Sequence, residues 1–257
     1  MKIATWNVNS IRVRLPQVLE WLKQEGPDIL CLQETKITDE EFPEAVFRDA
    51  GYHAAYAGQK TYNGVAILSR SEPGKMVTSL PGVDGAQKRL LAASVGNMRV
   101  VNVYVPNGEE VGSEKYSYKL SWLEALDKYL AAELEMHPRL AVLGDYNIAP
   151  EERDVHDPKL WTGRVLFSDP ERAAFQRLIG RGLVDVFRSF EQPERSFSWW
   201  DYRMNAFHRN LGLRIDHILC SSALASICRH CRIDGEPRKH ERPSDHAPVV
   251  AEFDDGR

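Results

Sequence analysis

Residues 140–147, with the sequence LAVLGDYN, constrain the fold of this chain more than any other stretch. Four apolar residues followed by a glycine predict a short, fully buried strand that ends abruptly. Asp145 and Asn147 come directly after it, two positions apart, so on an extended chain their side chains point to the same side. An acid and an amide placed together can activate a water molecule or bind a divalent cation. Both residue types are also common in simple turns, so this stretch alone leaves the function open.

The composition is that of an ordinary soluble globular protein, with 43% hydrophobic and 27% charged residues. Because the 257 residues show no internal repeat or linker, we expect one domain that covers residues 1–257. No apolar run reaches membrane-spanning length, and we expect no signal peptide and no membrane partner. Four cysteines are too few for a disulfide scaffold, which predicts a reducing compartment, the cytoplasm.

Apolar periodicity predicts an alternation of strands and helices. An apolar stripe at residues 15–22 predicts one helix, and a leucine stripe at residues 120–134 predicts a long one. Asp169 and Pro170 are typical of the N-cap and first residue of a third helix. The predicted strands lie at residues 3–6, 28–32, 64–68, 99–105, 140–143, 214–220 and 247–253, and the predicted irregular segments at 148–167 and 197–210.

Residues that bind metals or phosphates stand at or near the ends of these strands. Because parallel strands joined by a helix bring their carboxyl ends to one edge of the sheet, we expect these groups to converge. Each residue has an ordinary structural explanation when taken singly, but chance explains their shared position poorly. Oxygen ligands without clustered cysteine or histidine suit Mg²⁺ or Mn²⁺ rather than zinc. The set comprises Asn7, Glu34, Tyr104, Asp145, Asn147, Asp216, Asp245 and His246.

Basic residues are concentrated between residues 195 and 242. This segment holds nine Lys/Arg and five Asp/Glu, so it carries a net charge of +4 and the rest of the chain carries −8. A protein that pairs a nucleic-acid-binding region with an acidic metal site has such a distribution, and so does an uneven solvated surface. Charge alone does not separate the two.

Five segments, in chain order, resemble the exonuclease III family of Mg²⁺-dependent nucleases and AP endonucleases. The resemblance runs from residue 2 to about residue 253, and the combination of motifs is more specific than any one of them. It implies an α/β four-layer sandwich, in which two mixed β-sheets pack face to face and helices flank them. The segments are KIATWNVN at 2–9, LQETK at 32–36, GDYNIA at 144–149, GLRID at 212–216 and PSDHAP at 243–248.

The resemblance also implies a metal site for Mg²⁺, which Mn²⁺ is expected to replace. Glu34 is the principal implied ligand. The other members of the implied ligand set are Asn7, Asp245, Asp145 and Asn147.

Catalytic roles follow from the same resemblance. Asp145 is expected to take the proton from the attacking water, and Asn147 to orient that water or stabilise the transition state. His246, held by Asp216, and Tyr104 are expected to bind the scissile phosphate. A phosphorane gains negative charge as it forms, so a metal and fixed donors are what this reaction needs.

The implied partner is double-stranded DNA with 3′ ends, nicks or abasic sites, bound by a monomer. Trp199, Leu213 and Ile215 occupy positions that in the family form an apolar pocket for the sugar of the reacting nucleotide. Arg203 stands where the family inserts a side chain into the duplex groove. Aromatic and basic residues beside a phosphate site fit duplex binding with local distortion.

Leu166 departs from the family pattern. AP endonucleases carry a small residue before the phenylalanine equivalent to Phe167, which leaves room for an extrahelical abasic sugar. We therefore expect hydrolysis from 3′ ends, by 3′-5′ exonuclease and 3′-end cleaning activity, to exceed cleavage at internal abasic sites. A predominantly AP endonuclease activity is the alternative.

Two remoter alternatives share the fold. One is a small-molecule phosphoesterase acting on inositol phosphates or sphingomyelin, against which the segment 197–210 and the GLRIDH sequence argue. The other is an inactive binding module, which would be expected to have lost at least one of Glu34, Asp145, Asn147 and His246; all four are present.

Overall fold

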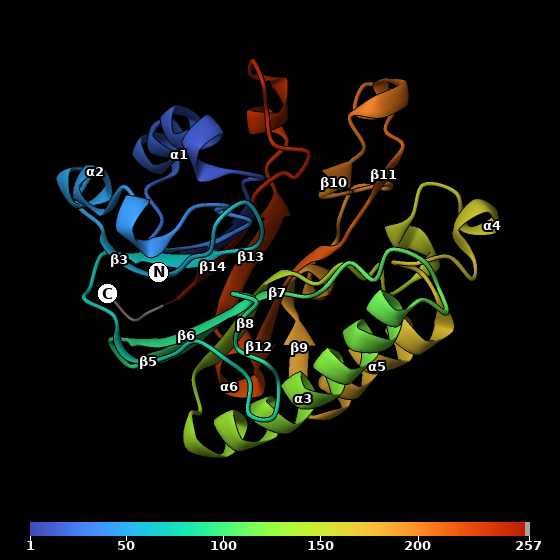
Figure 1. Cartoon of the computed structure of the whole chain (residues 1–257), viewed down its shortest axis with the longest axis horizontal. Helices are drawn as coiled ribbons and strands as arrows, with labels where there is room; N and C mark the ends of the chain where they lie inside the picture. Colours follow the sequence, from blue (N-terminus) through green and yellow to red (C-terminus); the bar gives the residue numbers. More distant parts are fainter. Residues whose placement is uncertain (255–257) are drawn as a thin grey trace.

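The computed structural model describes residues 1–254, which form two six-stranded β-sheets and a set of outer helices (Figure 1). The strand order is β13-β14-β1-β2-β4-β3 in the first sheet and β5-β6-β7-β8-β12-β9 in the second. The first sheet consists of β1 (Lys2–Asn7), β2 (Ile29–Gln33), β3 (His53–Ala57), β4 (Val65–Ser69), β13 (Cys228–Ile233) and β14 (Val249–Phe253). The second consists of β5 (Gly74–Val77), β6 (Leu90–Val95), β7 (Met98–Tyr104), β8 (Leu140–Asp145), β9 (Leu183–Asp185) and β12 (Asp216–Ser221). A separate ribbon pairs β10 (Trp199–Trp200) with β11 (Gly212–Leu213).

Helices close the outer faces of both sheets (Figure 1). α1 (Ile11–Glu25) and α2 (Glu44–Asp49) bury Val18 and Phe47 against the first sheet. α3 (Glu114–Met136) and α5 (Asp169–Gly180) bury Leu126 and Phe175 against the second. Two short helices, α4 (Pro158–Trp161) and α6 (Ser222–Ala225), complete the set. Within residues 1–254, no helix is long and apolar enough to cross a membrane.

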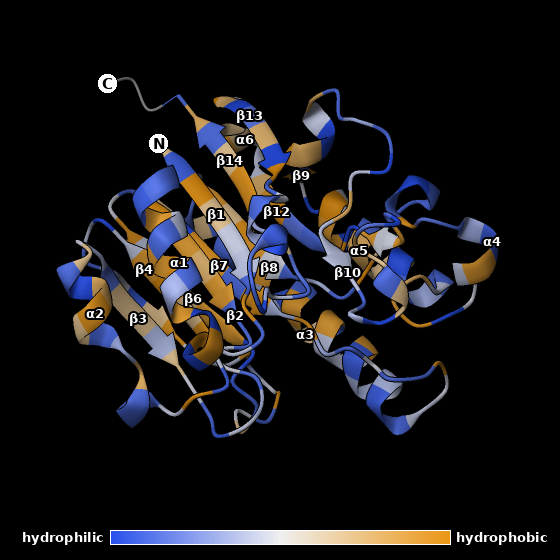
Figure 2. Cartoon of the chain, turned by 90° about the horizontal axis from the view of Figure 1, so that it is seen from above, coloured by the Kyte–Doolittle hydropathy of each residue, from blue (hydrophilic) through white to orange (hydrophobic). Residues whose placement is uncertain are grey.

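A third apolar layer lies between the sheets and holds them together. Ile29 and Ile67 of the first sheet share a buried cluster with Val100 and Leu143 of the second. Figure 2 shows these strands as a hydrophobic centre between helices that carry both hydrophilic and hydrophobic residues. Each central strand is therefore buried on both faces, which explains its continuous apolar sequence. The predicted four-layer sandwich is confirmed.

Strand direction brings the polar ends of the central strands to one end of the sandwich. β1 and β2 are parallel, as are β7 and β8, so each pair ends at the same sheet edge. β12 runs antiparallel to β8 and begins there, with Asp216 opposite Asp145. β14 runs antiparallel to β1, so His246, just before it, reaches the same end. The direction of the strands therefore brings these polar side chains to one place.

Gly144 is required where β8 meets β7. Its φ is 152°, and a Cβ at this position would lie 1.9 Å from the carbonyl oxygen of Val103. Only glycine tolerates that approach, so the residue that ended the predicted strand also lets Asp145 sit beside Tyr104.

Several predicted boundaries were wrong. The N-cap of α5 is Ser168, not Asp169, and its backbone N–H donates to the carboxylate of Glu171 at 3.1 Å. Ser168 takes the N-cap position in place of Asp169 because it forms a capping box with Glu171. The side chain of each of these two residues accepts a hydrogen bond from the backbone N–H of the other. The strand predicted from residue 214 begins at Asp216, and the loop predicted at 197–210 contains β10.

Strands β3, β5, β6 and β13 were not predicted. β3 and β6 contain pairs of alanines, which favour helix, and they become strands because a sheet neighbour pairs with them. β5 and β13 are edge strands. β5 is only four residues long and mostly exposed, and β13 carries Arg229, His230 and Arg232, so neither has a continuous apolar pattern.

Candidate active site

Asn7 connects two carboxylates that come from different sheets. It ends β1, and its Nδ2 donates to Glu34 Oε1 at 2.8 Å and to Asp145 Oδ2 at 2.9 Å. Its Oδ1 accepts from the backbone N–H of Asn9 at 3.0 Å. In this arrangement the amide nitrogen, not the oxygen, faces the carboxylates. Asn7 therefore links Glu34 to Asp145 in this arrangement.

Glu34 is held in an uncommon backbone conformation directly after β2. Its φ is 51°, in the left-handed region that residues other than glycine seldom adopt. Lys36 follows with a φ of 53° and places its ammonium 2.8 Å from Glu34 Oε2. Left-handed non-glycine residues are enriched at functional sites, where surrounding contacts hold them.

Glu34, Asp145 and His246 form a cluster that could hold a metal ion. Their ligand atoms all lie within 4.8 Å of one another. Glu34 and Asp145 supply the carboxylate oxygens that a hard divalent cation prefers as ligands.

Asp245 lies beside this cluster and not in it. Its Oδ1 accepts from Asn9 Nδ2 at 2.9 Å, and its Oδ2 accepts from Trp199 Nε1 at 3.0 Å. These bonds and the charge of His246 outweigh the effect of burial and lower the pKa of Asp245. In this arrangement its carboxylate fixes the Trp199 ring.

Asp145 and Asn147 come together through a turn, not through an extended chain. Asn147 has a φ of 49°, and its backbone N–H donates to Asp145 Oδ1 at 2.9 Å. Its Nδ2 donates to the carbonyl of Val105 at 3.0 Å and lies 3.4 Å from Asp145 Oδ2. The extended geometry expected from the sequence was wrong, although the two side chains do meet. The turn itself therefore places Asp145 and Asn147 together in the candidate site.

His246 is held by Asp216 and faces Asp145. Its Nδ1 lies 2.9 Å from Asp216 Oδ2, which also accepts from Ser198 Oγ at 2.7 Å, and its Nε2 lies 3.8 Å from Asp145 Oδ2. Burial alone would lower the pKa of His246, but Asp216 and Asp145 outweigh it and raise the pKa to about 10. Burial raises the pKa of Asp145 to about 7, against the opposing charge of His246. The imidazolium is thus a fixed cation next to a carboxylate suited to proton transfer.

Tyr104 ends β7 beside Asp145. Burial, and then the charge of Glu34, raise the pKa of its hydroxyl, which therefore stays protonated as a hydrogen-bond donor. The guanidinium of Arg89, the residue directly before β6, lies 4.6 Å from the centre of the Tyr104 ring and stabilises its position.

The residues predicted to line the sugar pocket are mostly buried. Leu213 and Ile215 are 0% and 1% exposed, and Leu166, 5% exposed, belongs to the same apolar cluster. Trp199 packs against this cluster and is half-buried. Arg203 has a side chain that is 84% exposed and paired with Asp201. The structure thus gathers Trp199, Leu213, Ile215 and Leu166, and leaves Arg203 at the surface.

Sequence reasoning missed four residues of this region. Asn9 and Lys36 contact Asp245 and Glu34, and both lie within the motifs 2–9 and 32–36, which was an available signal. Ser198, on Asp216, and Lys119, whose Nζ donates to the carbonyl of Asn147 at 2.7 Å, had no local signal.

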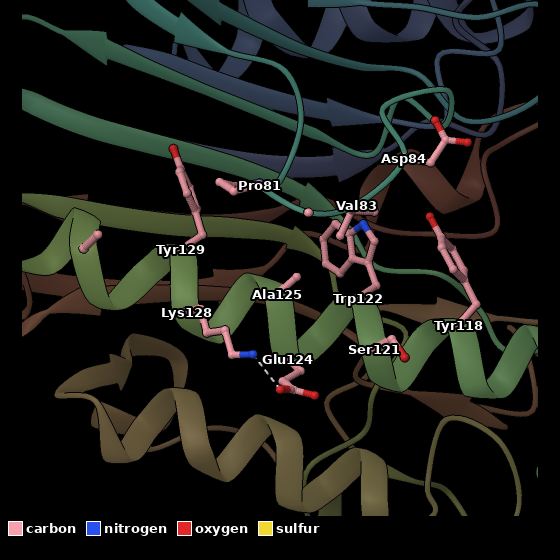
Figure 3. A pocket seen from close by; sticks show the side chains of 12 residues that line it. Pro81, Val83, Asp84, Tyr118, Ser121, Trp122, Glu124, Ala125, Lys128 and Tyr129 are labelled. Atoms are coloured by element: carbon pink, nitrogen blue, oxygen red, sulfur yellow. Dashed lines mark hydrogen bonds and ion pairs between the residues drawn. The ribbon is translucent and has the colours of Figure 1, made fainter.

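A cavity of about 600 Å³ between α3 and the loop at residues 81–84 is unrelated to this site. Figure 3 shows Tyr118 and Trp122 of α3 facing Val83 and Asp84 of a surface loop. None of the clustered carboxylates or the histidine lines it, so the chemistry is placed by the strand ends and not by this cavity.

Two carboxylates and an imidazolium thus meet at the shared end of two mixed sheets, an arrangement suited to metal-assisted hydrolysis. The chain belongs to the endonuclease/exonuclease/phosphatase family, whose sequence model matches residues 4–246.

Similar proteins cover the whole chain. An exodeoxyribonuclease III from Haemophilus influenzae is 39% identical, over 98% of this chain and 100% of that one. The 3′ phosphatase NExo from Neisseria, solved with a product DNA hairpin, is 49% identical with a TM-score of 0.97 over 99% of each chain. An AP endonuclease from Archaeoglobus fulgidus is 44% identical with a TM-score of 0.95, also over 99% of each chain.

Proposed function

We propose that this protein is a Mg²⁺-dependent DNA-repair phosphodiesterase of the exonuclease III type, which hydrolyses duplex DNA from 3′ ends. The observation that carries the proposal is the meeting of Glu34, Asp145 and His246 at the shared end of the two sheets. The similarity to an exodeoxyribonuclease III and to a 3′ phosphatase supports the choice of DNA as substrate.

Glu34 and Asp145 would hold the Mg²⁺, which when bound supplies positive charge to the phosphate oxygens. Asp145 accepts the proton of the attacking water, and the turn at Asn147 keeps its carboxylate oriented. His246, kept protonated by Asp216, and the hydroxyl of Tyr104 bind the scissile phosphate and stabilise its growing charge. Mn²⁺ is expected to replace Mg²⁺, because both prefer oxygen ligands.

The burial of the predicted sugar pocket favours action at 3′ ends over action at internal abasic sites. Leu166, Leu213 and Ile215 pack in one apolar cluster and are at most 5% exposed, so they offer an extrahelical sugar little accessible surface. A frayed 3′-terminal nucleotide approaches from the open end of the duplex and need not enter the same space. The alternative, a predominantly AP endonuclease activity, is favoured by the similarity to the Archaeoglobus fulgidus AP endonuclease.

A side-by-side assay tests both. Duplexes with a recessed 3′ end, a 3′-phosphate or an internal abasic analogue are incubated with Mg²⁺, with Mn²⁺ or with EDTA. We expect metal-dependent turnover that is faster at 3′ ends than at the abasic site. Full turnover in EDTA would remove the metal from the proposal, and faster abasic cleavage would select the alternative.

The Asp145→Asn variant tests the proton acceptor. It keeps the side-chain shape, so duplex binding should persist while the rate falls about 10²–10⁴-fold. Asp169→Asn, at a carboxylate that is 94% exposed, is the matched control and should keep the wild-type rate. Near-normal turnover of Asp145→Asn would assign the base to another residue.

We further propose that residues 1–257 act as one domain, as a monomer and in a reducing compartment such as the cytoplasm. The four free cysteines fit such a compartment. Size-exclusion chromatography with light scattering tests the oligomeric state.

A further inference from the structure

A cavity of about 400 Å³ lies between the segment 156–164, which contains α4, and the segment 199–211, which contains β10. Trp161 and Leu211 form part of its wall. Trp199 also lines the cavity, and the same side chain donates to Asp245 and packs on the cluster of Leu213 and Ile215. The cavity therefore shares a wall with the candidate active site. Its volume lies in the range of small-ligand sites, roughly 300–1,000 Å³.

Two indole rings line the cavity, those of Trp161 and Trp199. Both side chains are partly exposed, so a ligand in the cavity can contact them. Flat aromatic faces of this kind are surfaces on which a nucleobase stacks.

The charge at the cavity rim fits a nucleotide. Arg164 lines the cavity and is exposed, and its guanidinium makes no hydrogen bond or ion pair within the described part of the chain. The other rim arginine, Arg203, is paired with Asp201, so those two charges cancel. One free cationic group beside an aromatic slot favours an anionic ligand with a planar ring.

We propose that this cavity receives the base of the 3′-terminal nucleotide, the nucleotide that the enzyme releases. The inference rests on the proposed 3′-exonuclease function. Leu166, Leu213 and Ile215 are almost completely buried and offer a nucleotide little surface, whereas the cavity beside them is open. Trp199 lines the cavity, packs against this cluster and binds Asp245, so a base held in the cavity lies next to the candidate active site.

The proposal separates two reactions that use the same catalytic groups. In both, a water oxygen is added to phosphorus and the bond from phosphorus to the 3′ oxygen breaks, with the proton going to that oxygen. Exonuclease action releases a nucleoside 5′-phosphate, whereas removal of a 3′-phosphate releases inorganic phosphate. Only the first leaving fragment carries a base, so only the first reaction should depend on the cavity.

The test compares three duplexes that differ only at one 3′ end: a normal terminal nucleotide, a terminal nucleotide that lacks its base, and a 3′-phosphate. Trp161→Ala should lower kcat/KM for release of the normal nucleotide about ten- to a hundred-fold, because a base–indole stack is lost. Its rates on the other two duplexes should stay near wild type. Trp161→Phe keeps an aromatic ring, so its kcat/KM for the normal nucleotide should fall less than that of Trp161→Ala. Arg164→Ala should raise KM for the normal nucleotide. Lys159→Ala is the control, since this exposed residue lies in α4 but not in the cavity wall.

A binding measurement makes the inference independent of turnover. In an Asp145→Asn background, 2-aminopurine at the 3′ terminus should change its fluorescence on binding, and Trp161→Ala should abolish that change. Equal loss on all three duplexes would show a purely structural role for Trp161 and overturn the proposal, as would no loss on any. If the wild type releases no nucleotide, the proposed exonuclease function is wrong. The fluorescence measurement then tests separately whether the cavity binds the terminal base.

Discussion

At the residue scale, the site depends on backbone conformations that the local sequence does not favour. Glu34, Asn147 and Leu166 have φ values of 51°, 49° and 74°. A left-handed residue other than glycine costs about 1–3 kcal/mol and persists only when its surroundings fix it. Glu34 is held by its hydrogen bond from Asn7, and Asn147 is held by the bond from its backbone N–H to Asp145. The left-handed conformations of Glu34 and Asn147 thus occur where the side chains of the candidate active site are oriented.

We expect Glu34→Gln to abolish most activity without disturbing the fold. The amide retains an oxygen for the bond from Asn7 but loses the negative charge that a cation needs. Calorimetric titration should show weakened Mg²⁺ binding, and the rate should fall at least about a hundredfold. Glu72→Gln, at an exposed position, should leave both unchanged. Unaltered Mg²⁺ affinity in Glu34→Gln would place the metal on other residues.

Leu166→Gly should raise cleavage at internal abasic sites. Glycine accepts the φ of 74° without strain, and loss of the side chain opens the cluster around Leu213 and Ile215. Overpacking costs about 1–3 kcal/mol, so the gain should be roughly ten- to a hundred-fold, with little change in exonuclease rate. Leu166→Met, which keeps the volume, should behave as wild type. Efficient abasic cleavage by the wild type, unaltered in Leu166→Gly, would show that Leu166 does not control entry.

At the level of secondary structure, α3 contributes a buried lysine that contacts the turn after β8. Lys119 is 0% exposed, and its Nζ donates to the carbonyls of Asn107 and Asn147 at 3.0 and 2.7 Å and pairs with Glu171 at the start of α5. Glu171 in turn accepts from the backbone N–H of Leu166 at 3.0 Å. One charged pair therefore fixes both the turn after β8 and the backbone at Leu166.

Lys119→Met should destabilise the protein by about 3–5 kcal/mol, because it leaves the carboxylate of Glu171 buried without its partner. Urea unfolding followed by circular dichroism measures the loss. The control is Lys128→Met on the same helix, where the side chain is 71% exposed and its pair with Glu124 is worth little. Equal stability of the two variants would mean that Glu171 finds another partner.

At the scale of the whole molecule, buried polar networks hold segments that are distant in sequence. Between the sheets, Asn102 Nδ2 donates to the carbonyls of Leu32 and Ala66 at 2.9 and 2.8 Å. Behind β8, Arg214 lies 3.0 Å from His217 Nδ1, and His217 Nε2 lies 2.8 Å from the carbonyl of Ile148. Burial, and then the charge of Arg214, lower the pKa of His217 to about 4, so the ring is neutral in the folded protein.

The neutral His217 should make stability depend on pH. Between about pH 4 and pH 6.5 the unfolded chain binds a proton at this residue that the folded chain does not, so the free energy of unfolding falls as the pH falls. The contribution is at most about 1.4 kcal/mol per pH unit. Denaturant unfolding across this window should give a steeper dependence for the wild type than for His217→Gln. His208→Gln, at an exposed histidine, should keep the wild-type slope; a His217→Gln slope equal to wild type would contradict the prediction.

The central strands, the two long helices and the motifs that carry Glu34, Asp145 and His246 could be predicted from the sequence. These features depend on local apolar periodicity and on short motifs, which neighbouring residues specify. The order of strands and helices predicted that the polar strand ends meet, and the family resemblance of the motifs implied the four-layer sandwich. The left-handed turn at Asn147 was the structural alternative already present in the Asp-x-Asn pattern.

Only the tertiary structure decided what depends on partners far apart in the chain. The burial of Lys119 and Arg214 has no local signal, because each charge is stabilised by acids more than 25 residues away, Glu171 for one and Asp154 and Asp185 for the other. The edge strands exist because a neighbour pairs with them. The buried cluster at Leu166 and the cavity beside Trp161 likewise arise where segments such as 156–164 and 199–211 pack together, and only the folded chain brings these into contact.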